Sequence, residues 1–121
     1  MLNAKEIATM VAKAADSKKA ENIIILDVGN LLGITNYFVV CEGKTGRQST
    51  YISDFIQEKL REKKIKPIGI EGEDEGGWIL LDYGSVVVHI FTTEVRQYYQ
   101  LERLWKDAPR LEWEEDLEQR A

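Results

Sequence analysis

Hydrophobic residues recur along the chain with two different spacings, one typical of helices and one typical of strands. Ile7, Val11 and Ala14 follow the spacing of one helical face, and Asn3 with Glu6 forms the pair of a helix-capping box. Similar spacing recurs twice further along the chain. The predicted helices cover 3–19, the segment between the turn 43–46 and Pro67, and 94–105.

Short apolar runs rich in Val and Ile lie between these helices and are bounded by Gly, Asn and Pro. Runs of this length and composition are typical of sheet strands. The predicted strands are 22–28, 37–41, 68–70, 78–83 and 86–91. Helices and strands in this order indicate a single α/β domain over 1–109, followed by a charged C-terminal tail over 110–121.

The last two predicted strands flank Gly84 and Ser85, which fit a two-residue hairpin turn with Gly at the positive φ position. A turn of that length fixes which side chains share a face. One face carries Ile79, Leu81, Tyr83, Val86, Val88 and Ile90. The other face carries Trp78, Leu80, Asp82, Val87, His89 and Phe91. The first set is almost wholly aliphatic and is predicted to face the core.

The second face combines large aromatic residues with a carboxylate and an imidazole. An antiparallel sheet can leave one face in contact with water. Exposed Trp and Leu beside polar groups are typical of a surface that binds another molecule. We therefore expect a binding surface on this face of the hairpin.

His89 is the only histidine, so it is the first candidate for acid–base chemistry. Asp82 on the same face is a possible hydrogen-bond partner that would hold one tautomer. A nucleophilic site would also need an activated Ser or Cys, but Ser85 is a turn residue and Cys41 lies in an apolar strand. A structural or interface role for His89 is favoured over catalysis.

Two further segments are candidates for binding ions or nucleotides. Glu71, Glu73 and Glu75 alternate along a glycine-rich segment and could offer oxygen ligands to a cation, although a solvated loop is the favoured interpretation. The turn 43–47 contains Gly, Lys and Thr but not in phosphate-loop order, which favours a simple helix entry. We predict no metal site and no cofactor.

Aromatic residues on the third predicted helix leave two interpretations open. Tyr98, Tyr99 and Trp105 cannot all lie on one side of a helix. At least one of them therefore lies off the face that the others share. These aromatic residues belong either to the core or to an interface, and the sequence favours neither interpretation.

Charge and composition restrict the class of partner that we expect the protein to bind. The chain of 121 residues carries a formal net charge of −5, which argues against unspecific nucleic-acid binding. Between Pro67 and Leu101, Arg96 is the only basic side chain beside a group of Asp and Glu residues, which favours a basic protein partner. A single cysteine and the lack of a long apolar run favour a cytoplasmic protein without a membrane span.

Several of these segments together resemble the ribosomal silencing factor (Iojap-related) family, over about residues 7–109. The matching segments are Leu26-Asp27-Val28, Thr35 to Gly43, Arg47-Gln48, Glu71-Gly72, Gly77 to Gly84, Val86 to Phe91 and Glu94 to Pro109. Each piece is common, but their order and spacing together are specific to that family.

The resemblance implies a nucleotidyltransferase-like fold, with a mixed sheet flanked by helices and commonly a homodimer. It implies no catalysis. Such factors bind the large ribosomal subunit through its L-fourteen-type protein, hinder joining of the small subunit and lower translation when nutrients are short, with little direct nucleic-acid contact. The partner-binding positions implied by the family are Trp78, Leu80, Asp82, Tyr83, Ser85 and His89. Alternation along the strands agrees with this set except at Tyr83, which it assigns to the core.

Two positions depart from the family pattern: Asn36 and Ser85 each stand where Asp is usual. Ser85 removes a negative charge from the edge of the expected surface. The main alternative is a degenerate nucleotidyltransferase or nucleotide-binding enzyme that would use the turn 43–47 together with the acidic segment 71–75. Those enzymes need paired Asp residues after Gly-Ser, whereas here Val86 to Val88 follows Gly84-Ser85. An adaptor for another basic protein would use the same surface.

Overall fold

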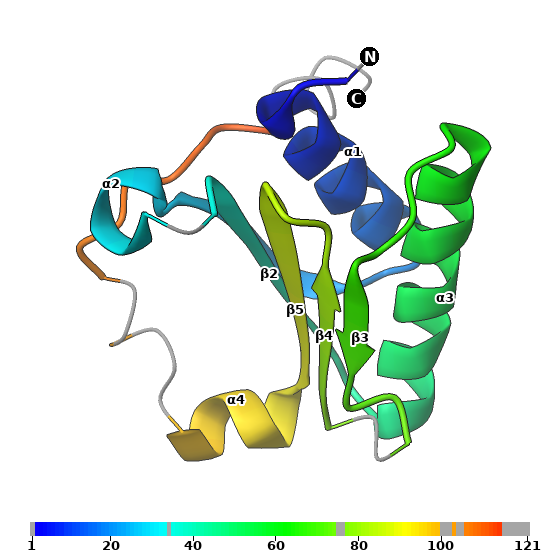
Figure 1. Ribbon diagram of the computed structural model, residues 1–121. Coiled ribbons are helices and arrows are strands. Elements are labelled where there is room, and N and C mark those ends of the chain that lie inside the picture. The colour runs from blue at the N-terminus through cyan, green and yellow to red at the C-terminus, as the bar shows by residue number, and fades with distance from the viewer. Residues whose placement is uncertain (1, 34, 75–76, 100–102, 104–105, 115–121) are drawn as a thin grey trace.

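The computed structural model describes residues 2–33, 35–74, 77–99, 103 and 106–114 (Figure 1). The elements are α1 (Ala4–Ser17), β1 (Glu21–Asp27), α2 (Gly29–Leu32), β2 (Tyr37–Gly43), α3 (Gly46–Glu62), β3 (Gly69–Glu71), β4 (Trp78–Asp82), β5 (Val86–Thr92) and α4 (Thr93–Tyr99). All five predicted strands and the first two predicted helices are confirmed. The short helix α2 lies where the sequence indicates a loop.

The strands form one mixed sheet in the order β1-β2-β5-β4-β3. Only the central pair, β2 and β5, is parallel, and the other neighbours are antiparallel. The crossover between β2 and β5 contains α3, β3 and β4. The expectation of a mixed five-stranded sheet flanked by helices is therefore confirmed.

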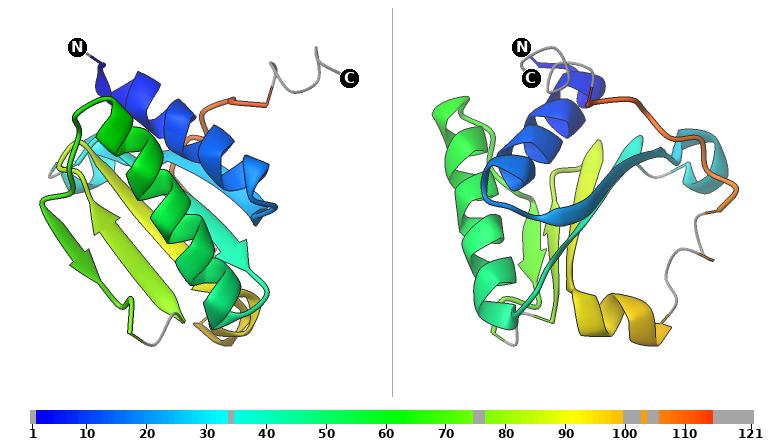
Figure 2. Two further views of the ribbon diagram at one scale, coloured as in Figure 1. Left: turned by 90° about the vertical axis from the view of Figure 1, so that its right-hand side faces the viewer. Right: turned by 180° about the vertical axis from the view of Figure 1, so that it is seen from behind.

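Helices α1 and α3 lie side by side on one face of the sheet (Figure 2). Asn3 caps α1 through the predicted capping box with Glu6, and Thr45 caps α3 by accepting from the amide of Gln48. The apolar stripe of each helix meets the aliphatic side chains of the sheet in the main core, which includes Ile56. This packing buries most of one face of the sheet, whereas the short edge strand β3 remains exposed.

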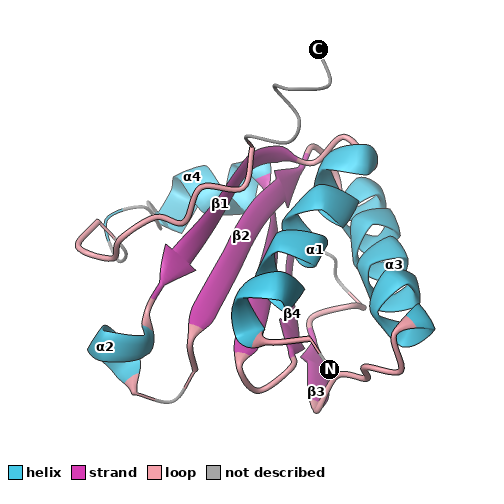
Figure 3. Ribbon diagram, turned by 90° about the horizontal axis from the view of Figure 1, so that it is seen from above, coloured by secondary structure: helices cyan, strands magenta, loops and turns pink. Residues whose placement is uncertain are grey.

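The opposite face is covered only in part. Figure 3 shows α4 on the far side of the sheet from α1 and α3. A second apolar cluster lies beneath α4 and the segment 106–110, and it contains Phe91, Val40, Val95 and Ala108. The expectation that this whole face is open to water is therefore wrong at the Phe91 end, because α4 starts directly after β5 and folds back onto it.

The C-terminal segment begins with a stretch that pairs with β1. Asp27 N–H donates to the carbonyl of Pro109 over 2.8 Å, and Leu111 N–H donates to Ile25 over 2.9 Å. Trp113 is buried in the main core. Residues 110–114 of the expected tail are thus attached to the sheet, and 115–121 lie outside the described residues. The predicted helix 94–105 is described as α4 up to Tyr99.

Candidate binding surface on the β4–β5 hairpin

The turn between β4 and β5 decides which side chains reach the partly covered face. Gly84 has a φ of 84°, and Tyr83 N–H donates to the carbonyl of Val86 over 2.9 Å. The loop therefore holds two residues, as predicted, and Gly adopts the left-handed conformation at little cost. The predicted division of the hairpin into two faces is confirmed.

Tyr83 lies on the core face, where strand alternation placed it. Its side chain is 8% exposed and belongs to the main core, whereas the surface implied by the family resemblance is on the other side of the sheet. Among the residues that the structure describes, its buried hydroxyl finds no hydrogen-bond partner. Burial raises the pKa of this hydroxyl to about 12, while the nearby Arg61 acts in the opposite direction. Tyr83 is not part of the exposed surface.

Four rings form a cluster on the partly covered face of the three strands β2, β5 and β4: Phe38, Trp78, His89 and Phe91. The edge of Phe38 meets His89 at a centroid distance of 4.6 Å, and Phe91 lies nearly parallel to His89 at 6.0 Å. Trp78 packs against Phe91 at 4.8 Å. Ring pairs at these separations attract one another beyond their apolar burial. We call these four residues the aromatic cluster.

Within the aromatic cluster, Trp78 is tied to His89 by a hydrogen bond. The indole Nε1–H of Trp78 donates to Nδ1 of His89 over 3.2 Å. The expected pairing of Asp82 with His89 is wrong: the Asp82 carboxylate instead accepts from the amide of Gly84 over 2.8 Å and closes the hairpin turn. The imidazole is therefore paired with the indole of Trp78, and the carboxylate stabilises the turn.

Burial fixes the protonation state of His89. Its side chain is 6% exposed, and loss of solvation lowers its pKa from 6.5 to about 4. The ring is therefore neutral at physiological pH. Because Nδ1 accepts from Trp78, the proton of the neutral ring resides on Nε2. A buried imidazole that is neutral at pH 7 is poorly suited to general acid–base work near that pH.

The exposed part of this face is a strip along β4 and the turn. Trp78 is 41% exposed, and Leu80, Asp82 and Ser85 are half-buried. His89 and Phe91 lie beneath the surface and support Trp78 from below. Four of the six expected partner-binding residues therefore reach the surface together, while His89 and Tyr83 do not.

A buried ion pair holds α4 against the sheet, and nothing in the sequence patterns singled it out. Arg96 Nη1 lies 3.2 Å from Glu42 Oε1 and donates to the carbonyl of Asn22 over 2.9 Å. Asn22 has a positive φ and donates its amide to the same carboxylate over 3.0 Å. The one available signal was Glu42, a carboxylate at the end of an apolar strand, but the sequence does not name its partner.

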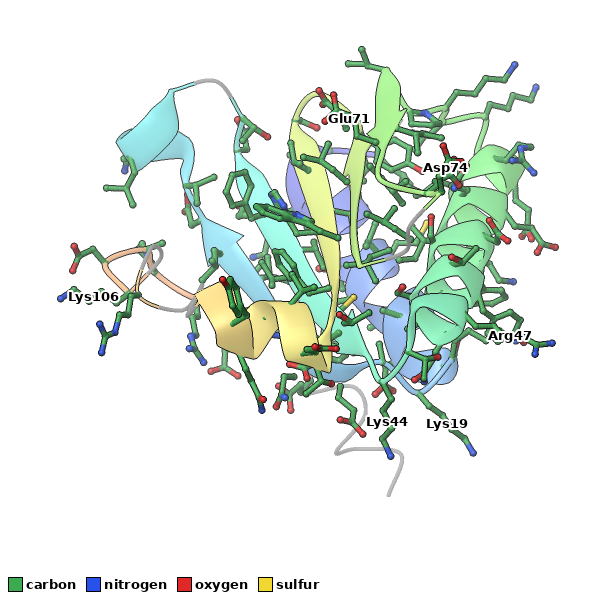
Figure 4. The ribbon with its side chains drawn as sticks, turned by 90° about the horizontal axis from the view of Figure 1, so that it is seen from below. Lys19, Lys44, Arg47, Glu71, Asp74 and Lys106 are labelled. Atoms are coloured by element: carbon green, nitrogen blue, oxygen red, sulfur yellow. The ribbon has the colours of Figure 1, made fainter. Side chains whose placement is uncertain are left out.

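The other candidate chemical sites are accounted for structurally. The pKa of the Cys41 thiol is raised to about 12 by burial, which keeps the thiol protonated and unreactive. The turn 43–47 forms the N-terminal cap of α3. Lys44 and Arg47 lie apart from Glu71 and Asp74 in Figure 4, so the two halves of the suggested nucleotide site are not brought together.

The acidic loop offers no ligand cluster among the residues that the structure describes. Within that part of the chain, no group of three or more His, Cys, Asp or Glu side chains is arranged to hold a metal ion. Glu73 accepts a hydrogen bond from Gln57 of α3 over 3.5 Å, and Glu75 lies outside the described residues.

Helix α4 places Tyr98 in solvent, with 77% of the residue exposed. This position favours the interface interpretation for Tyr98. The Tyr99 side chain and Trp105 lie outside the described residues. Among the described helices, none is long and apolar enough to cross a membrane.

Comparison with known proteins connects this chain to a family. The family model described as "Ribosomal silencing factor during starvation" matches residues 1–121. The ribosomal silencing factor of Bacillus subtilis is 41% identical over 89% of this chain and 92% of its own length.

A crystal structure of a Chromobacterium violaceum protein superimposes with a TM-score of 0.83 at 34% identity, covering 87% of this chain and 88% of that one. A mouse protein named for mitochondrial assembly of the ribosomal large subunit is 28% identical over 86% of this chain and 47% of its own length. The match over the whole chain and the high identity to a named relative leave one conclusion. The chain belongs to the ribosomal silencing factor family.

Proposed function

We propose that this protein is a ribosomal silencing factor that binds the large ribosomal subunit through its L-fourteen-type protein. Bound there, it blocks joining of the small subunit and represses translation under nutrient limitation. The relatives named as silencing factors, and the mouse relative named for assembly of the large subunit, support this type of target.

The observation that carries the proposal is the exposed strip of Trp78, Leu80, Asp82 and Ser85 on the face that α1 and α3 leave open. A half-exposed Trp on a rigid strand is typical of an interface anchor. Its only polar group is already bonded to His89, so its exposed surface is apolar. Such a ring can receive an aliphatic side chain or the cation of Lys or Arg.

Charge on the surrounding chain favours a basic partner. Asp82 lies on the exposed strip, and Glu71, Glu73 and Asp74 lie on the adjoining end of β3 and its loop. Ribosomal proteins are rich in Lys and Arg, and opposite charges at the rim of an interface speed association. An acidic protein can thereby act on an RNA-rich particle while making little contact with the RNA.

The two remaining positions implied by the family, Tyr83 and His89, have indirect roles in this proposal. Tyr83 anchors the hairpin in the core, and His89 supports Trp78. Binding requires no cofactor, metal or catalytic step, since occupation of the surface is sufficient to obstruct the subunit interface. The protein acts in the cytoplasm, where bacterial subunits join, and as a homodimer.

Co-sedimentation with purified ribosomal subunits tests the proposal directly. The protein is expected to pellet with large subunits and not with small ones, and to reduce formation of joined ribosomes in light scattering when added before the small subunit. A nucleotide- and Mg²⁺-dependent rise in melting temperature without subunit binding would instead favour the nucleotide-binding alternative.

A further inference from the structure

The contact between Trp78 and His89 has a geometry that strand pairing alone does not produce. Trp78 is directly opposite Phe91, and His89 is directly opposite Leu80, so Trp78 and His89 are diagonal neighbours on adjacent strands. Diagonal neighbours touch only when long side chains lean toward each other. The Trp78 indole leans along the sheet to place its Nε1–H on the imidazole Nδ1.

The imidazole is itself held on several sides. Phe38 of β2 meets it edge-on, Phe91 of its own strand lies parallel to it, and its side chain is almost fully buried. An imidazole in this position has little freedom to rotate. An acceptor with a fixed position restricts the rotamer of the donor, and here the donor is the exposed ring of the binding strip.

We propose that His89 is a positioning residue: it fixes the Trp78 indole in its partner-binding orientation and does not itself touch the partner. This inference rests on the proposed function, because it assigns Trp78 as the anchor. It changes the role implied by the family resemblance, in which position 89 contacts the partner. An apolar residue would fill the same space in the aromatic cluster but could not orient the indole.

His89 could position Trp78, contact the partner directly or only fill the core. A double-mutant cycle separates these three roles. His89→Phe keeps a buried ring and removes the acceptor, whereas Trp78→Phe keeps an exposed ring and removes the donor. His89→Phe in the otherwise unchanged protein is expected to weaken binding to large subunits about threefold to tenfold, which corresponds to one lost hydrogen bond. In the Trp78→Phe background it should change affinity by less than about twofold.

Other outcomes overturn the inference. An equal loss of affinity in both backgrounds means that His89 contacts the partner directly. No loss in either background, with affinity measured well below the melting temperature, means that the ring only fills the core. His89→Asn supplies an acceptor near the position of Nδ1, and partial recovery of affinity relative to His89→Phe is expected.

A spectroscopic measurement tests the contact without any partner. The indole Nε1–H resonance of Trp78 is assigned by its loss in Trp78→Phe. It is expected to move upfield and broaden in His89→Phe, and to return toward its original position in His89→Asn. An unchanged resonance in His89→Phe contradicts the inference. If the wild-type protein does not bind large subunits while the resonance shifts as expected, the contact is correct and the proposed function fails. If Trp78→Ala leaves subunit binding intact, Trp78 is not the anchor and the positioning role of His89 fails.

Discussion

His89 combines a polar ring with a position that almost excludes water. The native state holds this ring neutral down to about pH 4, whereas the unfolded chain binds a proton near pH 6.5. Between these two values the unfolded state binds more protons, so stability rises with pH. The contribution of His89 to the unfolding free energy is complete above pH 6.5 and is lost as the pH falls toward 4.

The first prediction follows from this difference in proton binding. His89→Phe should flatten the dependence of the unfolding free energy on pH, reducing the loss between pH 7 and pH 4 by about 3 kcal/mol. Urea unfolding of both proteins at half-unit pH intervals measures the effect. The acidic side chains are unchanged in the variant, so the wild-type curve is the control. Parallel curves would contradict the burial of a neutral imidazole.

The second prediction concerns Ser85, which stands at the edge of the exposed strip, at a position where the family resemblance implies Asp. Ser85→Asp adds a negative charge at the rim without changing the central contact. We expect faster association with large subunits at low salt, a steeper salt dependence and a nearly unchanged dissociation rate. Stopped-flow measurements over a range of ionic strength test this. Ser85→Asn is the uncharged control, and an equal effect of both substitutions would exclude electrostatic attraction.

At the scale of elements, β4 begins beside a tightly constrained glycine. Gly72 has a φ of 84°, and a Cβ there would come within 1.9 Å of the Trp78 carbonyl oxygen. Side chains are disfavoured in that conformation, and this contact is with backbone that must move. The start of β4, and with it the anchor of the binding strip, depends on this close approach.

The third prediction is that Gly72→Ala lowers the unfolding free energy by about 2 kcal/mol and weakens subunit binding as well. Gly69→Ala in β3 is a matched control, because a Cβ there meets no atom within 4 Å and the backbone does not have a positive φ. Urea denaturation measures the stability of both variants. Equal stability of the two would show that the backbone near Trp78 relaxes freely.

The fourth prediction concerns the attachment of α4. Arg96→Met leaves the buried Glu42 carboxylate without its cation and should cost about 3 kcal/mol. Lys44→Met removes the exposed Lys44–Glu21 pair and should cost less than about 0.5 kcal/mol. Adding Glu42→Leu to Arg96→Met should recover most of the loss, since both charges are then gone. A small effect of Arg96→Met would show that α4 is held by its apolar contacts.

Elements governed by local patterns could be predicted from the sequence. Alternation located the strands of the β4–β5 hairpin and assigned Tyr83 to the core, because a two-residue turn fixes both faces. Contacts between distant segments could not be predicted. The covering of Phe91 by α4 and the pairing of Glu42 with Arg96 depend on how the chain folds back. The choice of Trp78 over Asp82 as the partner of His89 depends on side-chain rotamers within a formed sheet.

At the scale of the whole molecule, the two faces of the sheet are unequal. Helices α1 and α3 bury most of one face, except at the edge strand β3, while α4 and the segment 106–110 cover one end of the other. The remaining strip of β4 carries an apolar anchor with acidic side chains nearby. Under the proposed function, this division lets a small domain keep its main core on one side and present a rigid strand to a partner on the other.

The fifth prediction tests that division and with it the central claim, through the affinity of Trp78→Ala for purified large ribosomal subunits. Tyr51→Ala is the control, because Tyr51 is an aromatic residue on α3, 54% exposed, on the opposite side of the sheet. We expect Trp78→Ala to weaken binding about 30-fold, as for an interface hot spot of about 2 kcal/mol, and Tyr51→Ala to bind like the wild type. Unchanged affinity of Trp78→Ala, in a variant that remains folded, would contradict the account.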